Sequence, residues 1–192
     1  NKMKIHQEVL KAEKQIRKFI RKTPIEFSPY LSKLCNCNVY LKLESEQLTG
    51  SFKIRGAFNK LLSCKSELNN GFITASTGKH GKAVAYVSKM LNLKGTVYVP
   101  KKVSKTKLEA IKFYGINIKK YNGTSGETEI HARKVAEKQE IPFISPYNDI
   151  DIVAGQGTVG YEIWEQLQDI NAIFVCIGGG GLISGIAGYL KH

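Results

Sequence analysis

The lysine at position 53 has the clearest potential for chemistry in this chain. It stands in the run Thr49-Gly50-Ser51-Phe52-Lys53-Ile54-Arg55-Gly56-Ala57, directly after a glycine turn and at the predicted start of a helix. An amine held there beside an aromatic ring is disfavoured in its charged form, and a neutral amine is a nucleophile. Taken alone, the run also fits a lysine on a solvated helix face.

Four consecutive glycines form the second feature. Gly178, Gly179, Gly180 and Gly181 follow the apolar run 173–177, which predicts a strand, and they precede a predicted helix. Glycines at a helix N-terminus let the backbone wrap closely around a phosphate group. A dinucleotide-binding site is disfavoured because no register of these glycines completes the spacing GxGxxG or GxGxxA. A nucleophilic lysine together with a phosphate cradle points to pyridoxal phosphate as a cofactor.

A third group of polar residues follows the predicted strand 72–75. The segment Ser76-Thr77-Gly78-Lys79-His80 carries two hydroxyl groups and opens a predicted helix. Its backbone N–H groups should therefore converge on a spot the size of an anion. We interpret the segment as a clamp for a substrate carboxylate. The alternatives are an ordinary helix capped by Ser76 or Thr77 and, for His80, a packing histidine.

Composition limits the classes of protein to which the chain can belong. It has 192 residues, 42% of them hydrophobic, and no apolar run approaches the ~20 residues that span a bilayer. The first residues lack the apolar block of a signal peptide, so we expect a cytoplasmic protein with no membrane partner. The formal net charge is +13, but the basic residues are mostly lysines spread along the chain. We therefore expect no specific nucleic-acid partner, only salt-sensitive binding to polyanions.

The four cysteines are Cys35, Cys37, Cys64 and Cys176, and they form no CxxC pair. Cys35 and Cys37 could chelate a metal in principle, but no histidine lies near them in the sequence. We predict reduced thiols and no metal site.

The elements that must position these residues alternate in type along the chain. Predicted helices cover residues 5–21, 51–62, 79–90, 104–115, 124–136, 155–168 and 181 onward, and predicted strands cover 39–43, 72–75, 96–99, 116–118, 142–144 and 172–177. Such alternation predicts α/β units with a mostly parallel, doubly covered sheet. We expect a small inserted domain over residues 71–145 and a larger domain built from residues 1–70 and 146–192.

In its motifs the chain resembles the fold-type II pyridoxal-phosphate enzymes of the threonine/serine dehydratase and serine racemase family. The matching segments are Thr23-Pro24, Leu41-Lys42-Leu43-Glu44, Thr49 to Ala57, Ser76 to His80, Ala154-Gly155-Gln156-Gly157-Thr158 and Gly178 to Leu182. They occur in the family's order and cover essentially the whole chain. The resemblance implies two doubly wound α/β/α units. Because the family's proteins continue for roughly another half of this length, the larger unit is expected to be incomplete here.

The resemblance also implies how the cofactor is held. Lys53 forms the Schiff base with pyridoxal 5'-phosphate, Phe52 lies against its ring, and the glycines with Leu182 bind its phosphate. Lys79 departs from the family, which has an asparagine bonded to the phenolic oxygen at that position. A lysine can still donate to that oxygen, but its positive charge should depress the pKa of the Schiff base. Lowered or altered activity is the expected result.

The reaction implied by the resemblance is β-elimination of water from L-threonine or L-serine, which gives a 2-oxo acid and ammonia. Ser76, Thr77, Gly78 and His80 bind the amino acid's carboxylate, and Lys53 takes the Cα proton. A serine racemase is the alternative enzyme, because Thr77 keeps a hydroxyl where the racemase has a proton-donating serine. A further alternative is a catalytically impaired, truncated paralogue that acts through dimer contacts.

By the same resemblance we expect a homodimer that acts on a small amino acid. The part of the family's fold beyond this chain would carry the partner of the pyridine nitrogen and a divalent-cation site. Cysteine-synthase-like chemistry is disfavoured, because the lysine and carboxylate loops of that group have different sequences.

Overall fold

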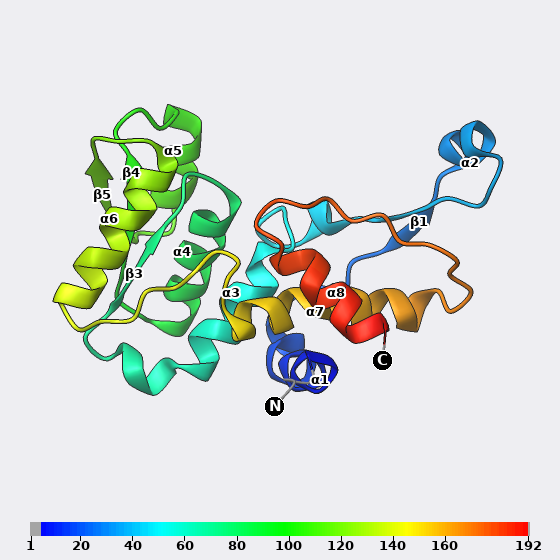
Figure 1. The fold of residues 1–192 in the computed structure, drawn as a ribbon, viewed down its shortest axis with the longest axis horizontal. Helices are drawn as coiled ribbons and strands as arrows, with labels where there is room; N and C mark the ends of the chain where they lie inside the picture. The colour runs from blue at the N-terminus through cyan, green and yellow to red at the C-terminus, as the bar shows by residue number, and fades with distance from the viewer. Residues whose placement is uncertain (1–4, 192) are drawn as a thin grey trace.

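Three short strands and three helices build an α/β unit from the middle of the chain, which is on the left of Figure 1. The structure is a computed structural model that describes residues 5–191. Residues 1–4, where no signal-peptide block is expected, and residue 192 lie outside the described part. The strands are β3 (Phe72–Ala75), β4 (Gly95–Pro100) and β5 (Asn117–Tyr121), and the helices are α4 (Lys79–Leu91), α5 (Lys105–Lys112) and α6 (Ser125–Lys138).

The three strands form a parallel sheet in the order β3-β4-β5, and helices cover both of its faces. One face packs Ile73 and Tyr98 against Ala132 and Ala136 of α6. The other face is closed by a second apolar cluster from β4, α4 and α5. The predicted strand 142–144 makes only an isolated parallel bridge, between Ile73 and Phe143. The parallel, doubly covered sheet predicted from the sequence is confirmed.

Side-chain caps set the starts of two helices in this unit, α5 and α6. The hydroxyl of Ser104 accepts a hydrogen bond from the backbone of Lys107 at the start of α5. Thr124 and Glu127 form a reciprocal capping box at the start of α6. Gly115, with φ +78, turns the chain between α5 and β5, a conformation that favours glycine. The starts of the helices predicted over 104–115 and 124–136 are confirmed.

A group of helices lies beside the α/β unit, with α7 at its centre (Figure 1). Its members are α1 (Ile5–Ile16), α3 (Lys53–Ser63), α7 (Ile150–Gln166) and α8 (Gly181–Leu190). Glycines let these helices approach closely, because a Cβ on Gly155 would lie 2.6 Å from the Cα of Gly56 in α3. A Cβ on Gly185 in α8 would lie 2.6 Å from the backbone nitrogen of Gly157. The position of α7 therefore fixes where α3 and α8 begin.

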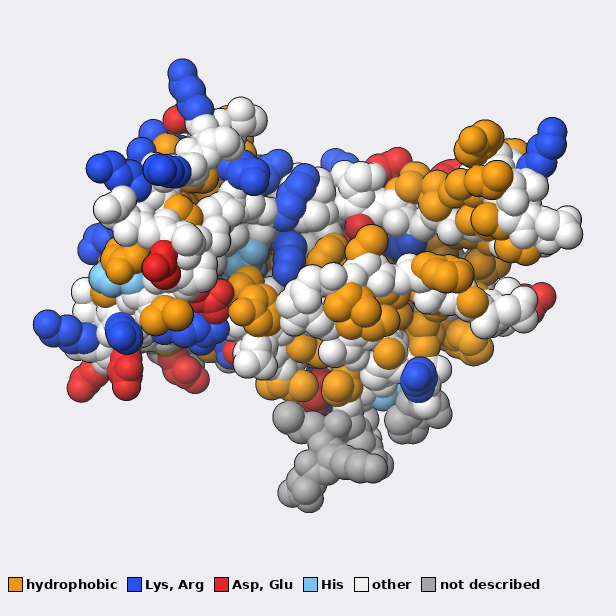
Figure 2. Space-filling view, turned by 45° about the horizontal axis from the view of Figure 1, so that its top comes forward, with side chains coloured by type: hydrophobic (Ala, Val, Ile, Leu, Met, Phe, Trp, Pro, Cys, Tyr) orange, Lys and Arg blue, Asp and Glu red, His pale blue; other side chains and the backbone are white. Residues whose placement is uncertain are grey.

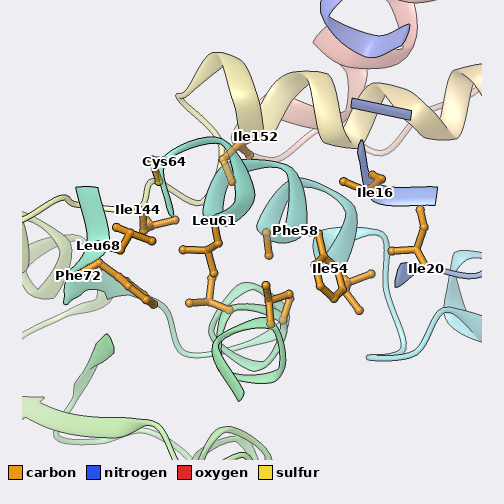
Figure 3. Close-up of a cluster of buried hydrophobic side chains, with 14 residues drawn as sticks. Ile16, Ile20, Ile54, Phe58, Leu61, Cys64, Leu68, Phe72, Ile144 and Ile152 are labelled. Carbon is orange, nitrogen blue, oxygen red and sulfur yellow. The ribbon is translucent and has the colours of Figure 1, made fainter. Parts of the chain in front are cut away.

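Helix α3 also joins the two parts of the molecule through a shared apolar core (Figure 3). Ile54, Phe58 and Leu61 point from α3 into a cluster that contains Phe72 of β3 and Ile16 of α1. All five side chains are at most 2% exposed. Burial of this size stabilises each side chain by about 1.5–3 kcal/mol, so the start of α3 is anchored from both sides.

An arm projects from the helical group, on the right of Figure 1. Its elements are β1 (Ile25–Phe27), α2 (Pro29–Cys35) and β2 (Tyr40–Lys42), with β1 antiparallel to β2. Ser28 caps α2, and Pro29 occupies its first position. The sequence predicts β2 but neither β1 nor α2, since both are short and lack apolar periodicity. The described chain also contains the 3-10 helices η1 (Arg17–Phe19), η2 (Glu44–Glu46) and η3 (Lys65–Leu68).

Two further predicted elements differ from the structure. The helix predicted over 155–168 begins earlier, at Ile150, because the carboxylate of Asp149 caps it. The strand predicted over 172–177 is wrong, since these residues are irregular and Phe174 is 97% exposed. A strand forms only where a neighbour pairs with its backbone, and no strand of the described residues pairs with this run. None of the helices within residues 5–191 has the length and hydropathy needed to span a membrane.

Candidate active site

Lys53 is the first residue of α3, directly behind a turn in which Gly50 has φ +72. Its ammonium donates a hydrogen bond to the carbonyl oxygen of Pro146 at 2.9 Å and lies 5.3 Å from the ring centroid of Phe52. Burial lowers the pKa of Lys53 below its ordinary value of 10.5. A lowered pKa of Lys53 is also what the sequence predicts. The cause is removal of the amine from water.

The glycine turn lies at the N-terminus of α8, where Gly180 is the N-cap with φ +85. No side chain caps this helix, so backbone N–H groups of its first turn lack an intrahelical partner. A Cβ added at Gly178 or Gly180 would meet no atom within 4 Å, so the backbone there borders open space. An uncapped helix start that faces open space is suited to a phosphate group. These residues therefore fit the phosphate end of pyridoxal phosphate.

One short segment brings Lys53 and the glycine turn together. Pro146 accepts the hydrogen bond of Lys53, and the next residue, Tyr147, packs against two of the glycines. A Cβ on Gly179 would lie 2.6 Å from Cδ1 of the Tyr147 ring, and one on Gly181 would lie 3.1 Å from the carbonyl oxygen of Tyr147. The amine and the phosphate cradle thus share a support, although Lys53 and Pro146 are 93 residues apart in the chain.

The segment predicted to bind a carboxylate, residues 76–80, lies beside the Gly50 turn that precedes Lys53. The ammonium of Lys79 donates to the carbonyl oxygen of Gly50 at 3.0 Å, three residues before Lys53. Gly78 is the N-cap of α4, and no side chain caps the helix, so the alternative of a cap by Ser76 or Thr77 is wrong. A Cβ on Gly78 would meet nothing within 4 Å. The start of α4 is therefore a second uncapped helix N-terminus.

Ser76, Thr77 and His80 occupy different environments within this segment. The hydroxyl of Ser76 accepts a hydrogen bond from the backbone of Gly78 at 3.3 Å and shapes the turn. Thr77 lines a cavity of about 520 Å³ at the carboxyl ends of β4 and β5. His80 is buried, and its Nε2 lies 3.1 Å from the hydroxyl oxygen of Thr74. Burial and the charge of Lys53 lower the pKa of His80 to about 3, so the ring is neutral.

A buried ion network holds the first turn of α3 behind Lys53. The guanidinium of Arg55 is fully buried and donates to both carboxylate oxygens of Glu44 and of Glu162, at 2.7–2.9 Å. Lys42 and Arg17 donate to Glu162 as well. Burial alone would raise the pKa of Glu162, but Arg55 and these cations lower it to about 2. The network ties α3 to α7 and fixes the direction of the turn that carries Lys53.

Sequence reasoning missed several residues that build the site. Pro146, Tyr147 and Thr74 carry no motif of their own, and only the fold brings them to Lys53, the glycines and His80. Leu182 follows the glycine turn in the first turn of α8, and its side chain packs in an apolar cluster that includes Phe52. Among residues 5–191, no three histidine, cysteine, aspartate or glutamate side chains are grouped so that they could hold a metal ion.

Fold and site together define an α/β protein in which a desolvated amine and a glycine-lined helix start are built on one support. The chain belongs to the pyridoxal-phosphate-dependent enzyme family, whose model matches residues 16–192. The resemblance inferred from the motifs is confirmed.

Known relatives place the chain more closely within that family. The catabolic L-threonine dehydratase of Staphylococcus aureus is 39% identical over 186 residues, which are 96% of this chain and 54% of the relative. A threonine deaminase isoform 2 structure from Solanum lycopersicum has a TM-score of 0.93 at 34% identity and covers 100% of this chain and 53% of its own. Maize serine racemase has a TM-score of 0.92 at 32% identity, over 97% and 57% of the two chains. The chain thus spans about half the length of the relatives that it matches.

Proposed function

We propose that this chain carries the cofactor-holding half of the active site of a threonine/serine ammonia-lyase. The reaction is the β-elimination of water from L-threonine or L-serine, with a 2-oxo acid and ammonia as products. The observation that carries the proposal is the shared support of residues 146–147, which joins the desolvated amine of Lys53 to the uncapped glycine turn. The threonine dehydratase and threonine deaminase relatives support the substrate class.

Different residues would hold different parts of the cofactor. The backbone N–H groups of Gly178–Leu182 would hold the phosphate of pyridoxal phosphate, Lys53 would hold its aldehyde end, and Phe52 would flank its ring. When bound, the cofactor supplies the electron sink for chemistry at the amino acid's Cα. Lys79 donates a hydrogen bond to Gly50 and so places a positive charge at the edge of the turn that precedes Lys53.

The substrate's carboxylate fits the second uncapped helix start. Backbone N–H groups at the beginning of α4, with the hydroxyls of Ser76 and Thr77, are donors suited to that anion. Lys53 is the base for the Cα proton, because burial lowers its pKa and so keeps more of its amine neutral near pH 7 than an exposed lysine would have.

Racemisation of serine is the second candidate function. Thr77 keeps a hydroxyl group, and its side chain borders the cavity at the carboxyl ends of the strands. The similarity to maize serine racemase supports this activity. The methyl group of threonine restricts its rotamers and leaves elimination as the main reaction that we propose.

We further propose a cytoplasmic homodimer with no specific nucleic-acid partner. Exposed apolar side chains support association between copies, and Figure 2 shows such side chains gathered over the arm. On the arm these residues include Phe27, Tyr30 and Leu34. Light scattering after size exclusion gives the oligomeric state directly.

The test of the proposed activity is product analysis with purified protein and added pyridoxal phosphate. L-threonine should yield 2-oxobutanoate and ammonia in equal amounts, and a Lys53→Ala variant should yield neither. Chiral analysis of L-serine reactions with Thr77→Ala as the control measures the racemase share. A preparation that binds the cofactor but forms neither a 2-oxo acid nor D-serine would contradict the proposal.

A further inference from the structure

The cavity that Thr77 lines is at the carboxyl ends of β4 and β5 and has a volume of about 520 Å³. The rest of its lining comes from the two turns that lead into α5 and α6, residues 100–104 and 122–125, and from the first turns of these helices. Thr77 belongs to residues 76–80, where we place the substrate's carboxylate. The cavity is therefore adjacent to the substrate and can receive a group that extends from its Cβ.

Three lysines give this lining a positive charge. Lys101, Lys102 and Lys107 are exposed, and in the described part of the chain their ammonium groups have no acidic side chain or other partner. Among the described residues that line the cavity, the one acid is Glu127, and its carboxylate already accepts a hydrogen bond from the backbone of Thr124 at 2.7 Å. The lysines of the lining are thus available to an anion that comes from outside the chain.

The helices add to this charge, because α5 and α6 both begin at the cavity. The amino end of a helix carries a partial positive charge and its carboxyl end a partial negative one. A second cavity, of about 560 Å³, lies at the opposite end of the sheet, where α4, α5 and α6 end. It also has two exposed lysines, Lys89 and Lys94, but the helix ends oppose their charge. The first cavity therefore favours an anion more strongly than the second.

The lining of the first cavity offers little to an apolar side chain. Pro100 and Val103 are its apolar members among the described residues, and the others are glycine, hydroxyl, amide or charged residues. The methyl group of threonine would gain little there, since hydrophobic stabilisation grows with the apolar area that is removed from water. A carboxylate in the place of that methyl group would meet lysine ammonium groups instead.

We propose that this cavity receives a side-chain carboxylate of the substrate and that Lys101, Lys102 and Lys107 determine this specificity. The substrate class is a 3-hydroxy amino acid with a second carboxylate. L-threo-3-hydroxyaspartate is such a compound, with a carboxylate where threonine has its methyl group. The Cα proton and the Cβ hydroxyl leave as water, and hydrolysis of the resulting enamine gives oxaloacetate and ammonia. The elimination itself comes from the proposed function, on which this assignment of the substrate rests.

Binding of two four-carbon acids to the cofactor-free protein tests the cavity without turnover. Succinate has a carboxylate at each end, and butanoate has a methyl group in place of one of them. Titrations followed by 1H–15N nuclear magnetic resonance should show about tenfold tighter binding of succinate than of butanoate. The largest shifts should fall on residues 100–104 and 122–125, which line the first cavity.

Two double variants separate the charge of this cavity from the charge of the whole protein. Lys101→Gln/Lys107→Gln should lose the preference for succinate. Lys89→Gln/Lys94→Gln removes the same charge at the second cavity and should keep the preference. All four lysines are exposed, so both variants should unfold at the temperature of the parent. Equal binding of succinate and butanoate, or a preference that Lys101→Gln/Lys107→Gln leaves unchanged, would overturn the inference.

Turnover with added pyridoxal phosphate separates this inference from the proposed function. The value of kcat/KM for L-threo-3-hydroxyaspartate should exceed that for L-threonine by about tenfold, and Lys101→Gln/Lys107→Gln should lower only the former. Turnover of L-threonine without a preference for the dicarboxylic substrate would overturn the inference and leave the proposed function in place. A lysine-dependent preference for succinate in a protein that turns over neither amino acid would refute the proposed function and leave the acid-binding cavity in place.

Discussion

Lys53 is chemically useful because the fold removes it from water without giving it an acidic partner. Its hydrogen bond goes to a neutral carbonyl, and burial is the cause of its lowered pKa. Lys60, seven residues later in the same helix, has the opposite environment. Burial would lower its pKa too, but Asp149 and Asp151 raise it to about 12. The groups around each lysine, rather than its position in α3, therefore make Lys53 a nucleophile and Lys60 part of a structural ion pair.

This contrast predicts opposite effects of Lys53→Met and Lys60→Met on stability. The folded pKa of Lys53 is lowered, so the unfolded chain binds more protons and stability rises as pH approaches 10.5. Lys53→Met should therefore stabilise the protein at pH 7, and the gain should shrink toward pH 10.5.

Lys60 contributes stability that is complete below pH 10.5 and is lost as the pH rises through about 12, so Lys60→Met should destabilise the protein at pH 7. Urea unfolding at both pH values measures the two differences, and a gain for Lys53→Met that did not change with pH would refute the assignment.

At the scale of elements, the ion network and the helix-crossing glycines place the starts of α3 and α8. Glu162 is fully buried and receives hydrogen bonds from three cations that come from three different segments. Gly155 and Gly185 allow α7 to contact α3 and α8 at backbone distance. Both devices join residues that are far apart in the sequence, and both fix the direction of the backbone that carries the site.

Glu162→Gln should destabilise the protein by about 3–5 kcal/mol at pH 7, because it leaves buried cations without their anion. Glutamate 162 has a pKa of about 2 in the folded protein against an ordinary 4.5, so its stabilisation is present above 4.5 and is lost as pH falls toward 2. The variant should flatten the acid dependence of unfolding in that window. Glu109→Gln, at an exposed pair with Lys112, is the matched control and should change stability by at most about 1 kcal/mol. Equal losses for the two variants would contradict the role of the network.

Gly185→Ala should push α8 away from α7, because the new Cβ would lie 2.6 Å from the backbone nitrogen of Gly157. We expect a loss of about 1–3 kcal/mol from overpacking and weaker binding of pyridoxal phosphate. Gly126→Ala in the first turn of α6 is the control, since its Cβ would meet nothing within 4 Å, and it should be neutral or stabilising. Thermal unfolding and cofactor titration measure both effects. Unchanged cofactor affinity in Gly185→Ala would separate helix packing from the glycine turn.

At the scale of the whole molecule, local motifs were predictable and distant pairings were not. The glycine turn, Lys53 and the starts of α5 and α6 are encoded by adjacent residues, so the sequence alone predicts them. The support from residues 146–147 depends on a contact across 93 positions, which no local pattern encodes. The strand expected at 172–177 failed for the same reason, since an apolar run becomes a strand only beside a partner.

That run leaves an apolar surface whose effect on association can be measured. Phe174 is 97% exposed and Ile177 is 73% exposed, within a stretch that carries no charge. Such segments pair readily between chains. Phe174→Lys should reduce concentration-dependent association while changing the unfolding free energy by less than about 0.5 kcal/mol. Phe113→Lys, at a residue 77% exposed on the α/β unit, controls for the added charge and should leave association unchanged. Analytical ultracentrifugation measures the association of the two variants and the parent. Equal association of all three proteins would refute a role for residues 172–177.

The central claim is that one amine, that of Lys53, is the attachment point of the cofactor in a chain that contains 29 basic residues. Borohydride reduction of the protein after incubation with pyridoxal phosphate, followed by peptide mapping, tests it most directly. The account predicts a single reduced adduct on Lys53, absent from Lys53→Ala, with Lys79 unmodified. An adduct on Lys79, or adducts spread over many lysines, would contradict it.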